Sequence, residues 1–211
     1  MSGDDLLPRG SFDKIDEDDD LAFYAPARLV THIDEVAIAA LTKLYRELLP
    51  SGGNILDLMS SWVSHLPVDR PYAEVVGHGM NPAELEANPR LGRWFVQDLN
   101  ADPLLPLQSD SFDAALCCVG VQYLQRPFEV CAEVRRILVP GAPFIVSFSN
   151  RCFPTKAVAI WRSADMPRQA ALIRLYLERT GFTEIEVRVL SDGTQSDPLI
   201  GVIGRAEAKF R

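Results

Sequence analysis

The spacing of apolar residues changes repeatedly between two periods along the chain. From residue 30 to residue 49, apolar side chains recur three or four positions apart with charged residues between them, which predicts an amphipathic helix. The turn-forming segment PSGG at residues 50–53 ends this helix, and the apolar run at 54–58 then predicts a buried strand. The same change recurs down to residue 204, so the pattern predicts alternating strands and helices.

The predicted elements follow one order. Strands are expected at residues 54–58, 74–77, 94–96, 112–118, 143–148, 185–190 and 199–204, and helices lie between them at 82–87, 128–138, 155–162 and 167–180. Strand and helix alternation is typical of a parallel sheet covered on both faces, and the closing strand pair predicts an antiparallel edge. We therefore predict an α/β fold with a doubly wound, mostly parallel seven-stranded sheet, which binds ligands at the carboxyl ends of its strands.

Charge is distributed unevenly along the chain. Residues 1–20 contain eight acids and two bases, so they carry −6 of the formal net charge of −8. A segment this charged and this poor in aromatic residues buries too little apolar surface to offset its ordering entropy. We therefore predict a disordered acidic tail over residues 1–20, dispensable for stability and binding, and a single domain over residues 21–211.

The composition also disfavours several classes of function. No stretch reaches the roughly 18 consecutive apolar residues of a membrane span, and the N-terminus is acidic where a signal peptide is basic. We therefore expect a cytoplasmic location and no membrane partner. Lys and Arg are scattered among acids, which argues against nucleic acid, and the four cysteines lack metal-ligand spacing. A small molecule is the expected partner, no metal is expected, and the oligomeric state stays open.

Several short motifs between residues 53 and 149 occur in a known order. The segment ILDL at 55–58 is followed by VVG at 75–77, QDLN at 97–100, LPLQSDSFDAAL at 105–116, VQYLQRP at 121–127 and EVRRILVPGAPFIVSFSN at 133–150. In residue identity and spacing this stretch resembles the class I S-adenosylmethionine-dependent methyltransferases, in particular their type 11 branch. The resemblance implies a Rossmann-like methyltransferase fold, S-adenosyl-L-methionine as cofactor, and methyl transfer to an unknown small-molecule acceptor.

The resemblance also implies roles for particular positions. Asp57 matches the acid that ends the first strand beside the methionyl amino group of the cofactor. Asp98 and Leu99 match the motif after the third strand that holds the adenine amino group. Asp113 matches an acid that fixes the start of the fourth strand, so we assign it to structure.

The cofactor loop departs from the family pattern. The three loop glycines of the family are replaced by Met59, Ser61 and Val63, and Gly79 stands where an acid holds the ribose hydroxyls. Because glycine permits positive φ and close approach of backbone N–H groups, we expect Met59 and Val63 to push the amino-acid end of the cofactor outward or to reroute the loop. Weak cofactor binding follows, which Gly79→Asp would tighten. The polar side chains available as replacements are Ser60, Ser61 and Asn81, and Asn81 suits a helix cap equally well.

The acceptor end is marked less clearly. Gln122 and Tyr123 match positions that face the acceptor in the family, and His32 lies at the head of the helix that covers the cofactor there. Tyr24 and Arg28 precede that helix and are candidates for closing the site, and Arg151 follows the fifth strand, where strand ends build the site. Arg151 and Lys156 would suit an anionic acceptor group, although a solvated basic loop explains them equally well. No catalytic base is assigned. Trp62 is expected to form a wall of the pocket rather than a plug in it.

Two functional hypotheses stay open at this point. The first is a methyltransferase with an unusual cofactor loop. The second is a pseudo-methyltransferase that has lost catalysis and serves as a binding or scaffolding protein, motivated by the missing glycines and ribose acid. A third, thiol-dependent arsenic methylation, rests on the cysteine count alone. Fold resemblance by itself licenses none of these activities.

Overall fold

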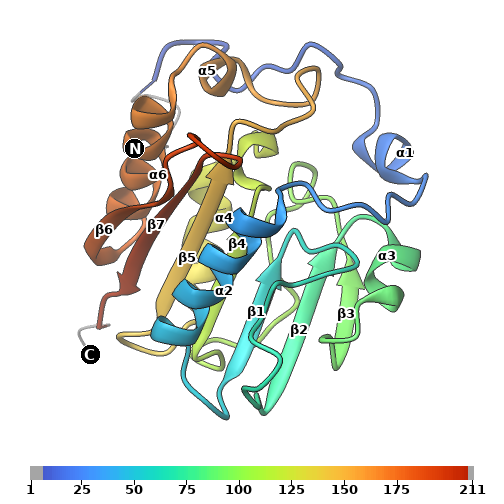
Figure 1. The fold of residues 1–211 in the computed structure, drawn as a ribbon. Helices are drawn as coiled ribbons and strands as arrows, with labels where there is room; N and C mark the ends of the chain where they lie inside the picture. Colours follow the sequence, from blue (N-terminus) through green and yellow to red (C-terminus); the bar gives the residue numbers. More distant parts are fainter. Residues whose placement is uncertain (1–6, 209–211) are drawn as a thin grey trace.

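The protein is built on one seven-stranded sheet. The computed structural model describes residues 7–208, and the strand order is β3-β2-β1-β4-β5-β7-β6. The strands are β1 (Asn54–Leu58), β2 (Glu74–Gly79), β3 (Arg93–Val96), β4 (Ala114–Cys118), β5 (Pro143–Ser149), β6 (Phe182–Ser191) and β7 (Leu199–Ala206). Strands β1 to β5 are parallel, and β7 runs antiparallel to β5 and β6 (Figure 1). The predicted sheet is confirmed.

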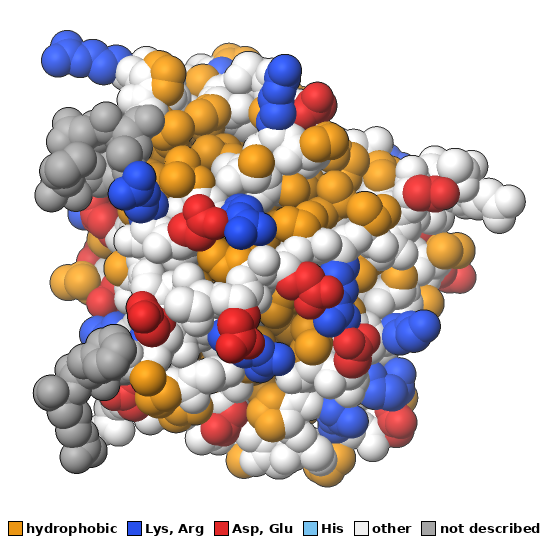
Figure 2. Space-filling view, turned by 90° about the vertical axis from the view of Figure 1, so that its left-hand side faces the viewer, with side chains coloured by type: hydrophobic (Ala, Val, Ile, Leu, Met, Phe, Trp, Pro, Cys, Tyr) orange, Lys and Arg blue, Asp and Glu red, His pale blue; other side chains and the backbone are white. Residues whose placement is uncertain are grey.

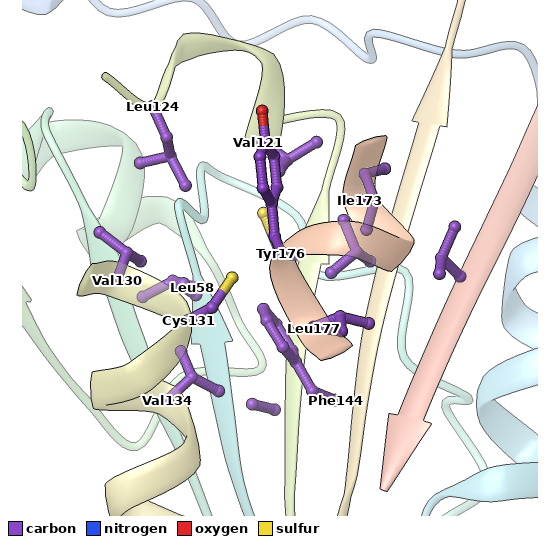
Figure 3. Close-up of a cluster of buried hydrophobic side chains, with 14 of the residues drawn as sticks. Leu58, Val121, Leu124, Val130, Cys131, Val134, Phe144, Ile173, Tyr176 and Leu177 are labelled. Carbon is purple, nitrogen blue, oxygen red and sulfur yellow. The ribbon is translucent and has the colours of Figure 1, made fainter. Parts of the chain in front are cut away.

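Helices cover both faces of the sheet. They are α1 (Asp20–Tyr24), α2 (Glu35–Leu48), α3 (Pro82–Ala87), α4 (Pro127–Ile137), α5 (Ala159–Arg162) and α6 (Met166–Arg179), with a short 3-10 helix, η2 (Val121–Tyr123). Helix α2 packs on one face through a buried cluster that includes Leu41, Leu44 and Ile55. Helices α4 and α6 lie together over the other face, where Figure 3 shows Val134 and Leu177 beside Phe144 of β5. Burying each such side chain contributes roughly 1.5–3 kcal/mol.

The parallel register brings the strand ends together at one edge. Asp57 of β1 lies beside Gly77 of β2 and beside Leu116 of β4. The order reverses between β1 and β4, which makes this the switch point at which ligands enter such sheets. No helix among residues 7–208 has the length and apolar character to cross a membrane. Figure 2 shows acidic and basic side chains interspersed on the β6 side of the molecule.

Some element boundaries differ from the sequence prediction. The first long helix begins at Glu35 instead of residue 30, because the Asp34 carboxylate caps it by accepting the Ala37 N–H at 2.9 Å. Helix α5 begins at Ala159 instead of residue 155. Residues 151–158 are instead an irregular segment against which the N-terminus packs.

The acidic N-terminal segment is the main correction to the sequence prediction. Residues 7–25, which we call the N-terminal strap, pass along the carboxyl edge of the sheet (Figure 1). The backbone N–H groups of Ile15 and Asp16 donate to the Thr155 carbonyl, and the Asp13 carbonyl accepts from Ala159. The expected disorder is therefore wrong for residues 7–20, and residues 1–6 lie outside the described part of the chain.

Buried ion pairs explain why this charged segment is ordered. The Lys156 ammonium is fully buried and lies 3.1 Å from a carboxylate oxygen of Asp16 and 3.1 Å from one of Asp20. Asp20 also pairs with Lys14 and accepts the Asn100 amide N–H at 3.0 Å. The acids thus have cationic partners within the fold, one of which is far away in sequence. A count of charge over residues 1–20 misses this compensation.

We expect Lys156→Met to destabilise the protein and loosen the strap. The change leaves Asp16 without the Lys156 cation and Asp20 with Lys14 alone, and breaking a buried pair from one side costs about 3 kcal/mol. For a chain of this size that corresponds to a fall in melting temperature of roughly 6–12 °C. The control is Lys43→Met on the exposed face of α2, which should change the melting temperature little. Equal melting temperatures for the two variants would contradict the anchoring role.

Candidate cofactor and acceptor site

A cavity of about 400 Å³ opens at the carboxyl ends of the parallel strands. Its walls come from the segments that follow β1, β2, β3, β4 and β5, together with the strap and residues 28–32. It holds eleven of the twelve residues predicted for the site: Asp57, Met59, Ser60, Ser61, Asn81, Asp98, Leu99, Tyr24, His32, Tyr123 and Arg151. The remaining one, Gln122, is buried beside the cavity and donates its amide N–H to the Val119 carbonyl at 2.9 Å. Its predicted contact with the acceptor is therefore not supported.

The loop after β1 keeps a glycine-like conformation without a glycine. Met59 has φ of +56°, in the left-handed region that non-glycine residues rarely adopt. Its side chain packs against the core above Gly120, where an added Cβ would lie 2.9 Å from the Met59 Cβ. Because Met59 occupies this space, position 120 has room only for a glycine. The loop keeps the backbone turn, and the methionine side chain packs over the segment that follows β4.

A buried histidine clamps this loop. The Met59 N–H donates to His78 Nδ1 at 3.1 Å, and the Ser60 N–H donates to the His78 carbonyl at 2.6 Å. The other ring nitrogen, Nε2, lies 3.0 Å from the Gln97 carbonyl, so the neutral tautomer with its proton on Nε2 satisfies both contacts. Burial lowers the pKa of His78 to about 4, partly opposed by the hydrogen bond to Gln97. His78 therefore joins the ends of β1, β2 and β3 as a neutral ring.

The rest of the loop is held by side chains from the α3 region. The Asn88 amide donates to the Ser61 carbonyl at 2.9 Å and to the Ser64 hydroxyl at 2.8 Å. The Ser61 hydroxyl donates to one oxygen of Glu84, and the other oxygen accepts the Arg28 N–H at 2.6 Å. The loop serines thus form hydrogen bonds within the protein. The Trp62 indole N–H donates to the Val30 carbonyl at 2.9 Å, and Trp62 lines the cavity as a wall.

Asp57 is a buried carboxylate whose side-chain partners are hydroxyl groups. It accepts the Ser60 hydroxyl at 2.7 Å and bonds the Ser64 hydroxyl. Burial raises its pKa to about 6, although both hydroxyls favour the charged form. None of the ion pairs among residues 7–208 involves Asp57. A cationic group of a ligand would supply the missing compensation.

The predicted ribose contacts are not supported. The side-chain oxygen Oδ1 of Asn81 caps α3 by accepting from the Glu84 N–H, and the side-chain amide N–H groups donate to the Tyr24 and Ala25 carbonyls, each at 2.9 Å. Asn81 therefore fastens the strap to α3. A Cβ added to Gly79 would lie 2.5 Å from the Ser60 carbonyl oxygen, because His78 holds the loop directly over this strand end. The expected gain from Gly79→Asp is wrong for this steric reason.

Asp98 follows a strand and Asp113 precedes one, so the two acids lie at opposite ends of the strands and have different roles. Asp98 lines the cavity and uses one oxygen to accept the Asn100 N–H at 2.8 Å, while the neighbouring Leu99 is buried in the core. Asp113 lies away from the cavity and accepts the Asn54 N–H at 2.8 Å, which joins the start of β4 to β1. The structural role predicted for Asp113 is confirmed.

At the acceptor end, two of the expected cations are already paired. Lys156 is buried under the strap with Asp16 and Asp20. Arg151 lines the cavity but donates to Asp197 at 3.0 and 2.9 Å. His32 also lines the cavity, and burial lowers its pKa, so its imidazole is neutral at pH 7. His65 lies nearby with its pKa lowered to about 4 by burial. No group of side chains within the described residues could hold a metal ion.

The residues that hold the loop are not marked by the sequence motifs. His78, Glu84 and Asn88 each lie outside the motifs that carry the resemblance. A usable signal was the Gly-His-Gly segment at the end of a buried strand, since a polar ring flanked by glycines there has little room and must find partners. Phe153, which lines the acceptor end, carried no signal of its own.

We expect the stability conferred by His78 to depend on pH. Its folded pKa of about 4 lies below the ordinary value of 6.5, so the unfolded chain binds the proton first. This contribution is complete above about pH 6.5 and falls by up to about 3 kcal/mol as the pH drops towards 4. His78→Gln keeps an acceptor and a donor but cannot titrate.

The check is the melting temperature of both proteins between pH 7 and pH 4. The difference between the two curves removes the contributions of Asp57 and His65, which also titrate there. The parent should lose more stability than His78→Gln on acidification. Parallel curves would contradict the proposed clamp.

Comparison with known proteins shows what part of the chain, and which fold, it shares with them. Residues 60–146 match the family described as a methyltransferase domain, and no curated protein matches the chain. A chain in the complex of the Haloferax volcanii Trm112 methyltransferase activator with a methyltransferase has TM-score 0.64 and 18% identity, with 84% of this chain and 92% of that chain covered. The cyclase SpnF has TM-score 0.60 and 16% identity, with coverage of 80% and 81%.

A further solved structure with the same fold is that of a methyltransferase whose cofactor is given as S-adenosylmethionine. An S-adenosylmethionine-dependent methyltransferase from Mesorhizobium loti has TM-score 0.57 and 20% identity, with 81% of this chain and 99% of that chain covered. At these identities the solved structures show the shared fold, and the sequence match covers the segment from the cofactor loop to β5. Residues 60–146 therefore resemble a methyltransferase domain, and the chain has the same fold as solved S-adenosylmethionine-dependent methyltransferases.

Proposed function

We propose that the protein transfers the methyl group of S-adenosylmethionine to a small-molecule acceptor bound in this cavity. The observation that carries the proposal is Asp57, a buried carboxylate at the switch point of the sheet whose side-chain partners are hydroxyl groups. Its charge has no cationic partner among the described residues. The ammonium group of the cofactor's methionyl end has the charge and hydrogen-bonding capacity to fill that role.

The other walls fit the remaining parts of the cofactor. Asp98 and Leu99 lie after β3, where the carboxylate would accept a hydrogen bond from the adenine amino group and Leu99 would contact the ring. When bound, the cofactor supplies a methyl group activated on a sulfonium. The chain's contribution is to hold both reactants in line and to keep water out, with Trp62 and the strap forming the outer walls.

The acceptor side offers a neutral imidazole that could act as a base. His32 lies in the cavity wall next to Phe153, with ring centroids 5.9 Å apart. Because its imidazole is unprotonated at pH 7, it could take a proton from an acceptor heteroatom. Tyr24, Tyr123 and Arg151 are the other acceptor-side residues in the proposal. From the sequence we also propose a cytoplasmic location.

The pseudo-methyltransferase alternative gains no support from the loop geometry. It was motivated by the missing glycines, yet Met59 keeps a positive φ and the loop is fastened by His78 and Asn88. The missing ribose acid still favours weak binding. Calorimetric titration with S-adenosylhomocysteine tests the proposal directly, and no heat together with no shift in melting temperature at millimolar ligand would overturn it.

We expect Asp57→Asn to weaken binding of S-adenosylhomocysteine without lowering stability. Loss of one charge-assisted hydrogen bond, worth roughly 1.5–3 kcal/mol, corresponds to a fall in affinity of about 10- to 100-fold. In the parent, affinity should rise as the pH increases through about 6, because Asp57 then ionises. The variant should lose that dependence. Its melting temperature at pH 7 should not fall, because the mutation removes a buried charge.

The matched control is Asp113→Asn, an acid at the opposite end of the sheet. It should lower the melting temperature slightly, because the Asn54 N–H would then donate to a neutral amide oxygen instead of a carboxylate, and it should leave ligand affinity unchanged. If both variants bound the ligand as the parent does, Asp57 would have no role in cofactor binding.

A second binding prediction concerns the adenine end. Asp98→Ala should lower affinity for S-adenosylhomocysteine by about tenfold, the size expected for one hydrogen bond to a charged acceptor. Asp102→Ala is the control, because Asp102 makes the same kind of local turn by accepting the Leu104 N–H but is exposed outside the cavity. Calorimetry on both variants separates the ligand contact from the turn. Equal losses for the two would assign the effect to the loop.

A further inference from the structure

The acceptor end of the cavity is surrounded by aromatic rings from three distant segments. Tyr24 comes from α1 in the strap, Tyr123 from η2 after β4, and Phe153 from the segment after β5. The ring centroids are 6.4 Å apart for Tyr24 and Tyr123, 6.3 Å for Tyr24 and Phe153, and 6.0 Å for Tyr123 and Phe153. These three rings, which we call the aromatic triad, offer faces and edges to a flat ligand.

One polar group of the triad is buried without a partner. The Tyr24 hydroxyl has no hydrogen-bond partner among the described residues, although its oxygen is shielded from solvent and Tyr24 lines the cavity. Burial raises the pKa of Tyr24, so the group stays an O–H donor at neutral pH. A buried hydroxyl left unpaired costs free energy. It therefore points to a ligand atom that accepts a hydrogen bond.

Arg28 is the cation that the fold leaves available here. Its guanidinium lies 5.9 Å from the Tyr24 ring centroid and 5.3 Å from that of Phe153, and it donates to the Phe23 and Pro26 carbonyls. Within residues 7–208 it forms no ion pair with a carboxylate. Glu84 contacts Arg28 through the backbone N–H. The guanidinium therefore has donors left for an anion.

The alternative cations lack this freedom. Arg151 is paired with Asp197, and Lys156 is buried beneath the strap. A positively charged acceptor would be repelled by Arg28, whereas a carboxylate would gain a planar, charge-assisted contact. The rings favour a planar ligand and the Arg28 cation favours an anionic one, so a single planar anion satisfies both.

We propose that the acceptor is a planar aromatic acid, with its ring held by the aromatic triad and its carboxylate, or a similar anionic group, bound by Arg28. This inference rests on the proposed methyltransferase function, because it specifies the substrate class of the same cavity. The proposal also gives the strap a role in recognition of the acceptor, since Tyr24 lies in the strap and Arg28 lies shortly after its end.

The experiment compares three probes that differ in one property each. Cinnamate is aromatic and anionic, cinnamamide is aromatic and neutral, and 3-cyclohexylpropanoate is anionic without an aromatic ring. Binding is measured by calorimetry and by saturation-transfer NMR, with and without saturating S-adenosylhomocysteine. We expect cinnamate to bind at least tenfold more tightly than either other probe. If it does not, the proposed acceptor class is wrong.

Variants then locate the two contacts. Arg28→Gln should lower the affinity for cinnamate at least tenfold and leave that for cinnamamide unchanged, while Phe153→Leu should weaken both. Arg168→Gln, on the exposed side of α6, controls for loss of one positive charge and should bind all probes as the parent does. Loss of cinnamate binding in Arg151→Gln with none in Arg28→Gln would overturn the assignment to Arg28.

Two further measurements, the affinity for S-adenosylhomocysteine and the melting temperature, distinguish failure of this inference from a folding defect and from failure of the proposed function. Each variant is first titrated with S-adenosylhomocysteine and melted, and an unchanged affinity and melting temperature show that the fold and the cofactor end are intact. If the parent fails to bind S-adenosylhomocysteine but still prefers cinnamate through Arg28, the proposed function falls and the aromatic-acid site stands. If it binds S-adenosylhomocysteine but shows no preference for cinnamate, only the present inference is overturned.

Discussion

The hydrogen bonds of the buried His78 ring impose the constraint on which the rest of the site depends. Its Nδ1 accepts from Met59 after β1, and its Nε2 lies 3.0 Å from the Gln97 carbonyl after β3. The contact with the Met59 N–H requires an unprotonated Nδ1 and hence a neutral ring, and burial keeps the ring neutral by lowering its pKa. Because the loop is fixed over the end of β2, Gly79 must stay small and Asp57 remains enclosed. The hydrogen bonds of this single ring therefore hold the loop conformation at positions where the sequence resemblance leads one to expect glycines.

A second constraint acts from the opposite side of the cavity. The strap is held by the buried pairs of Lys156 with Asp16 and Asp20, and Asn81 fastens its end by donating to the Tyr24 carbonyl. These contacts tie the strap to the segment after β5 and to α3. The ring of Tyr24 and the guanidinium of Arg28 are thereby placed beside residues that lie far away in sequence. The ion pairs that anchor the strap therefore also position the residues of the acceptor end.

The loop after β1 forms its turn without a glycine. Positive φ at a non-glycine residue is costly, and Met59 tolerates it because its side chain packs over Gly120 and its N–H bonds His78. The serines of the loop fill their hydrogen-bonding capacity with Asp57, Glu84 and Asn88. The charge of Asp57 is what this network leaves without a cation, which is why the cofactor proposal rests on it.

The sequence by itself determined the sheet, the order of its strands along the chain and the positions of Asp57 and Asp98, because hydrophobic period and strand-end motifs are local properties. It misjudged the acidic segment, whose compensating lysine lies about 140 residues away. It also could not foresee that Asn81 would bind the strap, that Gln122 would turn into the core, or that Arg151 would be taken by Asp197. Only the tertiary structure decided which polar groups find partners within the protein and which are left for a ligand, since pairing depends on distance in space rather than along the chain.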